Sequence, residues 1–106
     1  MEAISHKPVP YRPVHPGEIL NDEVEERGLS VQQLAEQMGI DYIELDGILH
    51  AQRPITPEVA LLIEATLGLN ADTLVNMQTG YDMQVARKDK KLRSRIDSIR
   101  RLTAII

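Results

Sequence analysis

Residues 30–39 read Ser-Val-Gln-Gln-Leu-Ala-Glu-Gln-Met-Gly, and residues 40–50 continue Ile-Asp-Tyr-Ile-Glu-Leu-Asp-Gly-Ile-Leu-His. Ser30 is a favourable N-cap, because its hydroxyl can accept a hydrogen bond from a backbone N–H in the first turn of a helix. Gly39 suits the left-handed conformation that often ends a helix. Together these two residues predict a helix over 31–38.

The second half of this stretch predicts another short helix. Asp41 is an N-cap for a helix over 42–50, which Gly47 weakens slightly. The apolar residues of both helices recur at helical spacing and predict a shared inner face, made of Leu34, Ala35, Met38, Leu45, Ile48 and Leu49. Two short helices joined at a tight turn have the layout of a helix-turn-helix unit.

Three further helices are expected around this pair. Pro16 and Gly28 bound the first, and Pro57 and Gly68 bound the fourth, since proline favours a first helical turn and glycine a C-terminal one. The fifth is expected over 71–87. Their expected buried positions are Ile19, Leu20, Val24, Val59, Ala60, Leu62, Ile63, Leu67, Leu74, Val75, Met77, Tyr81 and Val85. No stretch shows a strand pattern, so the sequence predicts an all-α, five-helix bundle.

Composition limits the class of protein. The chain has 106 residues, which is the length of one domain, and 42% of them are hydrophobic. The absence of cysteine excludes disulfides, thiolate nucleophiles and cysteine-ligated zinc. No apolar run is long enough to span a bilayer, and no signal sequence precedes the first helix, so we expect a cytoplasmic protein without a membrane partner.

Charge divides the chain into two parts. Residues 88–106 carry seven Lys and Arg against two Asp, a net charge of +5, whereas residues 1–87 carry a net charge of −9. Residues 15–70 hold only Arg27 and Arg53 against eleven Asp and Glu. Such a body is expected to attract basic proteins and to repel duplex DNA, because lysine and arginine supply most of the affinity for phosphates.

The basic C-terminal segment, residues 88–106, has the pattern of an additional amphipathic helix. Its apolar residues follow a helical seam, with Arg93, Arg95, Arg100 and Arg101 off it; the seam is formed by Leu92, Ile96, Ile99, Thr103 and Ile106. We expect this helix to pack on the body or on a second copy, with Leu92, Ile96 and Ile99 in a homodimer interface. A DNA-contacting arm and a basic helix on a membrane surface are alternatives. Residues 1–14, with three prolines, are expected to form an extended arm.

Several motifs carry a family resemblance across residues 15–87. They are His15-Pro16-Gly17-Glu18-Ile19-Leu20, Gly28-Leu29-Ser30, Leu34-Ala35, Met38-Gly39-Ile40, Arg53-Pro54-Ile55-Thr56, Ala60-Leu61, Leu67-Gly68, Asn76-Met77-Gln78 and Tyr81-Asp82-Met83. With these motifs the chain resembles the HigA/VapI-type antidote proteins of toxin–antitoxin systems. The combination of the first of these motifs with the last two is specific to that family.

This resemblance implies a five-helix, Xre/Cro-like (lambda repressor-like) helix-turn-helix domain over 15–87. It implies an antitoxin of a plasmid maintenance system that neutralises a RelE-like, mRNA-cleaving toxin and represses its operon as a dimer on operator DNA. The helix over 31–38 would lie across the DNA backbone and the helix over 42–50 in the major groove. The DNA-binding residues would be Gln32, Gln33, Tyr42, Ile43, Glu44, Gln52 and Arg53.

The chemistry of the second helix fits DNA poorly. Its outward positions are expected to be Tyr42, Ile43, Glu44, Asp46 and Gly47, and none of these is an Arg, Lys, Asn or Gln, the residues that best read base edges. An alternative is therefore a helix-turn-helix-fold protein-interaction module that has lost DNA binding. A free-standing regulator without a toxin is a third interpretation.

Catalytic and metal-binding interpretations have little support. His6, His15 and His50 are far apart in sequence, and His15 is expected to cap or pack at the first helix. The acidic group at positions 22, 23, 25 and 26 is typical of a solvated helix face. We expect no enzyme activity, no metal and no cofactor.

Overall fold

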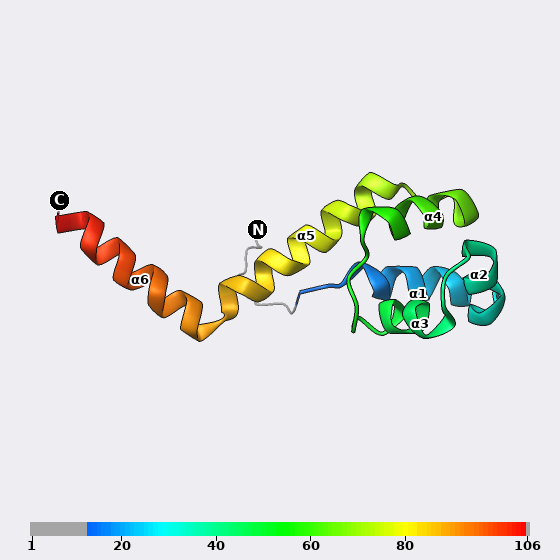
Figure 1. Ribbon diagram of the computed structural model, residues 1–106, viewed down its shortest axis with the longest axis horizontal. Helices are drawn as coiled ribbons and strands as arrows, with labels where there is room; N and C mark the ends of the chain where they lie inside the picture. The colour runs from blue at the N-terminus through cyan, green and yellow to red at the C-terminus, as the bar shows by residue number, and fades with distance from the viewer. Residues whose placement is uncertain (1–12, 106) are drawn as a thin grey trace, which may run out of the picture.

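Capping residues and glycines divide the described part of the chain, residues 13–105 of this computed structural model, into six helices (Figure 1). The helices are α1 (Pro16–Glu26), α2 (Val31–Met38), α3 (Tyr42–Leu49), α4 (Pro57–Leu67), α5 (Ala71–Lys88) and α6 (Lys90–Ile105). The all-α prediction with an additional C-terminal helix is confirmed. α3 ends one residue earlier than expected, because His50 is its C-cap and its backbone is no longer helical.

The predicted caps at the centre of the chain are present. The Ser30 hydroxyl accepts a hydrogen bond from the backbone N–H of Gln33 over 3.2 Å, and the Asp41 carboxylate accepts one from Ile43 over 3.0 Å. Gly39 has a φ of 74°, in the left-handed region. These contacts are local, which is why sequence alone located both helices.

One aliphatic core joins α1 to α5. Its largest fully buried aliphatic side chains are Leu20, Leu34, Leu45, Ile48 and Ile63, each at most 2% exposed. α2 and α3 pack against each other, and α4 packs on both α2 and α5. The expected inner face of the helix-turn-helix pair is confirmed.

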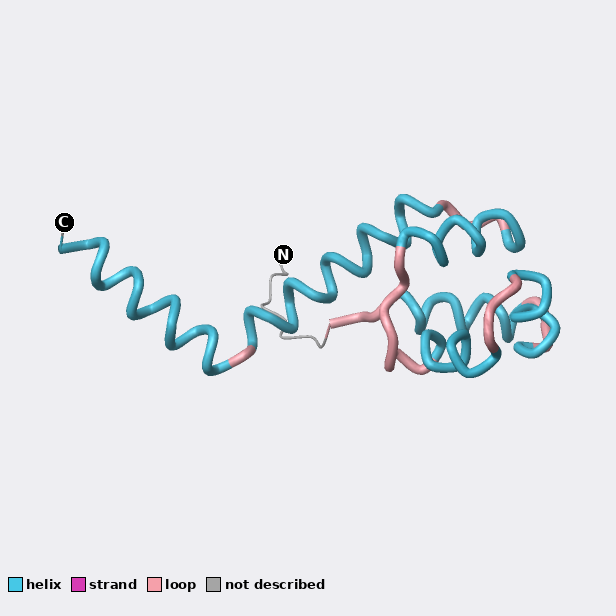
Figure 2. The backbone as a smooth tube through the Cα atoms, viewed as in Figure 1, coloured by secondary structure: helices cyan, strands magenta, loops and turns pink. Residues whose placement is uncertain are grey.

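Two residues expected in the core are exposed. Ile19 is 43% exposed, because α1 turns its Leu20 and Val24 positions inward and Ile19 falls at the edge of that face. Val85 is 46% exposed, because the second half of α5 extends beyond the bundle that the other described helices form. Figure 2 shows this second half of α5 as an uninterrupted helix leading away from the bundle.

α6 begins where Asp89 interrupts the helical path. The backbone of Asp89 is extended, and its carboxylate accepts hydrogen bonds from the N–H groups of Lys91 and Leu92, so it caps a new helix in a new direction. Figure 1 shows α6 extending away from the bundle. Of the two arrangements expected for α6, packing on the body of its own chain is therefore wrong, whereas packing on a second copy stays a prediction. Leu92 and Ile99 are exposed.

Parts of two expectations lie outside the described residues. The arm predicted over 1–14 is described only at residues 13 and 14, which have no regular structure, and the seam residue Ile106 is likewise not described. None of the helices within residues 13–105 is both long enough and apolar enough to cross a bilayer.

Candidate nucleic-acid interface

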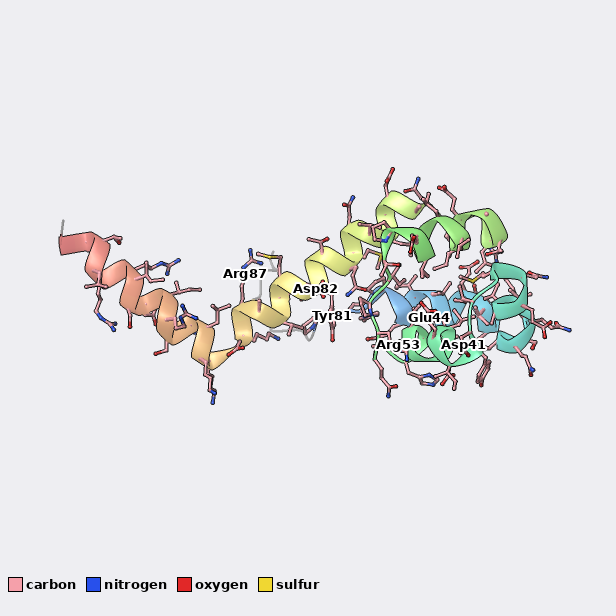
Figure 3. All side chains as sticks on the ribbon, in the orientation of Figure 1. Asp41, Glu44, Arg53, Tyr81, Asp82 and Arg87 are labelled. Carbon is pink, nitrogen blue, oxygen red and sulfur yellow. The ribbon has the colours of Figure 1, made fainter. Side chains whose placement is uncertain are left out.

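The residues expected to contact DNA come from α2, α3 and the loop after α3. Gln32 and Gln33 are exposed in the first turn of α2. Tyr42 and Ile43 are 47% and 65% exposed at the start of α3, and Glu44 is half-buried one position later. Gln52 and Arg53 are exposed in the loop. Figure 3 shows Asp41, Glu44 and Arg53 gathered around α3, whereas Tyr81, Asp82 and Arg87 follow α5 away from it.

Gly47 does not face outward as expected. It is buried, and a Cβ placed on it would lie 3.0 Å from Cδ and 3.1 Å from Cγ of Arg53. The aliphatic stem of Arg53 therefore lies across the backbone of α3, with its guanidinium free to reach solvent. A larger residue at position 47 would displace Arg53 from α3.

The end of α3 is closed by a backbone motif that its sequence does not predict. The N–H of Ala51 donates to the carbonyl of Ile48 over 3.1 Å, and the N–H of Gln52 donates to the carbonyl of Gly47 over 2.8 Å. This is a Schellman arrangement, which needs a left-handed residue after the cap. Ala51 occupies that position with a φ of 61° although it is not a glycine.

Gln78 holds the other end of the loop and is the residue that sequence analysis missed. It is 7% exposed on α5, its Oε1 accepts a hydrogen bond from the backbone N–H of Ile55 over 2.8 Å, and its Nε2 donates to Asp82 over 3.0 Å. The loop carrying Gln52 and Arg53 is thus tied to α3 at one end and to α5 at the other. The sequence offered one indication of this role. Gln78 stands four residues after the buried Leu74, so it lies on the inner face of α5.

His15 connects α1 to the same region. It is 2% exposed, its Nδ1 accepts a hydrogen bond from the N–H of Gly17 over 2.8 Å, and its ring meets the edge of Tyr81 at a centroid distance of 4.8 Å. Desolvation lowers the pKa of His15 below its ordinary 6.5 and outweighs the opposing effects of Glu18, Asp82 and a hydrogen bond with the Arg53 backbone. The expectation that His15 caps the first helix is confirmed.

Gly17 brings α1 against the backbone of α3. A Cβ at this position would overlap the carbonyl oxygen of Ile48 and would lie 2.9 Å from Nδ1 of His15. His15, Gly17 and Gln78 therefore position α3 and the following loop, although none of them belongs to the exposed surface.

The charges on the exposed surface of α2 and α3 do not favour binding to DNA phosphates. The carboxylate of Asp41 occupies the N-terminus of α3, and Asp46 lies 3.4 Å from Nδ1 of His50 at the other end. Neither α2 nor α3 contains a lysine or an arginine. The side chains available for bases are Tyr42 and Ile43, which suit a thymine methyl, and Glu44, which can accept from a cytosine amino group.

Within residues 13–105, no group of three or more His, Asp or Glu side chains is arranged to hold a metal ion. A hollow of about 260 Å³ lies beside the positioning residues. It is lined by His15, Ala51, Gln52, Arg53, Pro54, Gln78, Tyr81 and Asp82. Among these residues, the side chains of His15, Gln78, Tyr81 and Asp82 make the contacts described above.

Comparisons with known proteins agree with this architecture. The helix-turn-helix family model matches residues 20–74. Virulence-associated protein I of Dichelobacter nodosus is 38% identical over 79 residues, covering 74% of this chain and 73% of the relative. An addiction module antidote protein of the HigA family from Coxiella burnetii has a solved structure with a TM-score of 0.72 and 34% identity, covering 83% of this chain and 95% of that one. The Pseudomonas aeruginosa antitoxin HigA, solved with the higBA promoter, gives a TM-score of 0.68 and 31% identity, covering 72% of this chain and 84% of that one.

Proposed function

The chain belongs to the HigA/VapI-type antidote family of Xre-type helix-turn-helix proteins, and we propose that it is an antitoxin that also represses transcription as a dimer on operator DNA. The observation that carries this proposal is the α2–α3 pair. The two helices share one buried face and expose Gln32, Gln33, Tyr42 and Ile43 beside it. A relative with the same fold was solved on its promoter.

On DNA, α2 lies across the phosphate backbone and α3 enters the major groove. Gln32 and Gln33 donate to phosphate oxygens, as do Gln52 and Arg53 from the loop. Tyr42 and Ile43 contact thymine methyl groups, and Glu44 accepts from a cytosine amino group. The contacts with bases are therefore mainly apolar, and phosphate contacts from this surface contribute little to the affinity for DNA.

A mobility-shift titration tests the DNA-binding part. At low salt the protein is expected to prefer the DNA upstream of its own gene over a scrambled duplex of equal length. The double variant Tyr42→Ala/Ile43→Ala is expected to lose this preference. Leu61→Ala is the matched control, because Leu61 is an exposed apolar residue, at 58%, on α4. Equal preference in both variants would contradict the assignment of α3.

The partner of the antitoxin is a basic, RelE-like toxin that cleaves mRNA. An enzyme that binds RNA presents positive charge, and residues 1–87 of this chain carry a net charge of −9, so the two attract each other during association. Co-expression with the neighbouring reading frame tests this part. A complex that forms at low salt and weakens as salt rises supports it, and two separately eluting proteins at low salt contradict it.

Self-association uses the seam of α6 formed by Leu92, Ile96 and Ile99. Ile99 is 54% exposed on a helix that its own bundle does not cover. Burying such residues against a second copy removes apolar area from water. Ile99→Asp is expected to shift the sedimentation equilibrium towards monomer. Ser94→Asp, which adds the same charge on the opposite side of α6, is expected to leave the dimer intact.

A protein-interaction module that has lost DNA binding is the second candidate. The observation that favours it is the acidic character of α3, which has Asp41 at its N-terminus and Glu44 and Asp46 along its length. This candidate predicts toxin binding without any preference for upstream DNA.

A further inference from the structure

The junction between α5 and α6 concentrates positive charge outside the helix-turn-helix unit. From residue 87 to residue 101 the chain holds eight Lys and Arg against two Asp, which gives a net charge of +6. All eight basic side chains are exposed. The proposed function uses only the apolar seam of α6, so this charge has no role there.

A hollow of about 330 Å³ lies at this junction, lined by Arg87, Arg93, Ile96, Asp97 and Arg100. Arg93 and Arg100 are seven residues apart, or about two turns, so both lie on the same face of α6. Arg87 comes from the last turn of α5, as Figure 3 shows. Two helices therefore contribute three arginine side chains to the lining of one hollow.

No described side chain neutralises the guanidinium groups of these three arginines. Across residues 13–105, none of the three makes an ion pair or a hydrogen bond, including with Asp97, which lines the same hollow. The hollow therefore has three positive groups against one negative group. Its volume is about ten times the share of one water molecule in the liquid, which leaves room for a tetrahedral anion and part of its hydration shell.

We propose that the α5–α6 hollow is a phosphate-binding site, formed by Arg87, Arg93 and Arg100. Guanidinium groups present a planar fork of donors that binds phosphate oxygens in pairs, and this geometry distinguishes them from lysine. The phosphate belongs to the backbone of duplex DNA or to a free phosphate ester. If the ligand is DNA, the site adds phosphate contacts to the few that the acidic α2–α3 surface supplies.

Pyrophosphate titration of the full-length protein tests the site directly. The Nε–H signals of the arginines are followed by NMR at constant ionic strength, with chloride as the reference anion. Pyrophosphate is expected to shift a subset of these signals with saturation, and Arg93→Gln/Arg100→Gln is expected to abolish the saturable response. Lys91→Gln/Arg95→Gln is the matched control, since it removes the same charge from the opposite side of α6. A response no larger than that to chloride, or one equally reduced in the control, overturns the proposal.

DNA binding then distinguishes the two sources of phosphate. With an unrelated duplex, the slope of log affinity against log salt is expected to fall by about two per protomer in Arg93→Gln/Arg100→Gln relative to the control, if the backbone is the ligand. Equal slopes together with an intact pyrophosphate response identify a free phosphate ester. If the variant instead turns a dimer into a monomer and pyrophosphate does not bind, the hollow holds an acidic segment of a second copy and the proposal is overturned. Preference for upstream DNA is a separate readout, so the proposed function can fail while this inference stands.

Discussion

Replacing Gly17 by alanine is expected to destabilise the protein strongly. The new Cβ would overlap the backbone carbonyl oxygen of Ile48 on α3. A flexible side chain could rotate away, but a carbonyl inside a helix moves only with the helix, so α1 and α3 must separate. Overpacking of this kind costs about 3 kcal/mol, and the better helix propensity of alanine returns at most about 1 kcal/mol. The expected net loss is about 2–3 kcal/mol, a large part of the stability of a domain of this size.

Gly80→Ala is the matched control for this prediction. Gly80 lies within α5, and a Cβ on it would meet nothing within 4 Å. Alanine there is expected to stabilise the protein by about 0.5–1 kcal/mol, because glycine loses more conformational entropy in a helix. Urea unfolding followed by circular dichroism measures the free energy of unfolding of both variants. In thermal unfolding, the midpoints of the two variants are expected to move in opposite directions. If Gly17→Ala unfolds within about 0.5 kcal/mol of the wild type, the close approach of α1 and α3 is not a constraint on the fold.

Three further variants test the polar contacts and the charge of α3. Burial lowers the pKa of His15, so the unfolded chain binds the proton more tightly and stability is lost as the pH falls below 6.5. His15→Asn keeps a capping acceptor and is expected to lose less stability than the wild type between about pH 7.5 and about pH 5.5; an equal loss in both proteins would show that this histidine does not titrate as described. Gln78→Leu leaves the buried N–H of Ile55 without an acceptor and is expected to cost about 2 kcal/mol in urea unfolding, whereas a cost under about 0.5 kcal/mol would mean that water replaces the amide. Glu44→Lys/Asp46→Lys is expected to raise affinity for unrelated duplex DNA and to steepen its salt dependence; unchanged binding would place α3 away from DNA.

The candidate interface was only partly readable from the sequence. Gln32, Tyr42 and Ile43 are exposed as expected, because their positions follow from helical periodicity once the caps at 30 and 41 are recognised. Gly47 was placed outward on the same periodicity. That prediction was wrong because Arg53, in the following loop, folds back over it, and a helical wheel contains no information about a loop.

The local rules of the sequence determined where α2 begins and ends and where α3 begins. Ser30, Gly39 and Asp41 act on backbone groups within four residues of themselves, so their effect does not depend on the rest of the fold. The alternation of aliphatic and polar residues likewise determined that α2 and α3 share a buried face.

Only the tertiary structure decided how the loop after α3 is held and where α6 goes. The hydrogen bond between Gln78 and Ile55 joins residues 23 positions apart in the sequence. The contact between His15 and Tyr81 joins the N-cap of α1 to α5, which are farther apart still in the sequence. No periodicity predicts which distant backbone group a buried amide will find, because that depends on how five helices pack at once. The direction of α6 depends on the extended backbone of Asp89, and it places Arg93 and Arg100 beside Arg87 of a different helix.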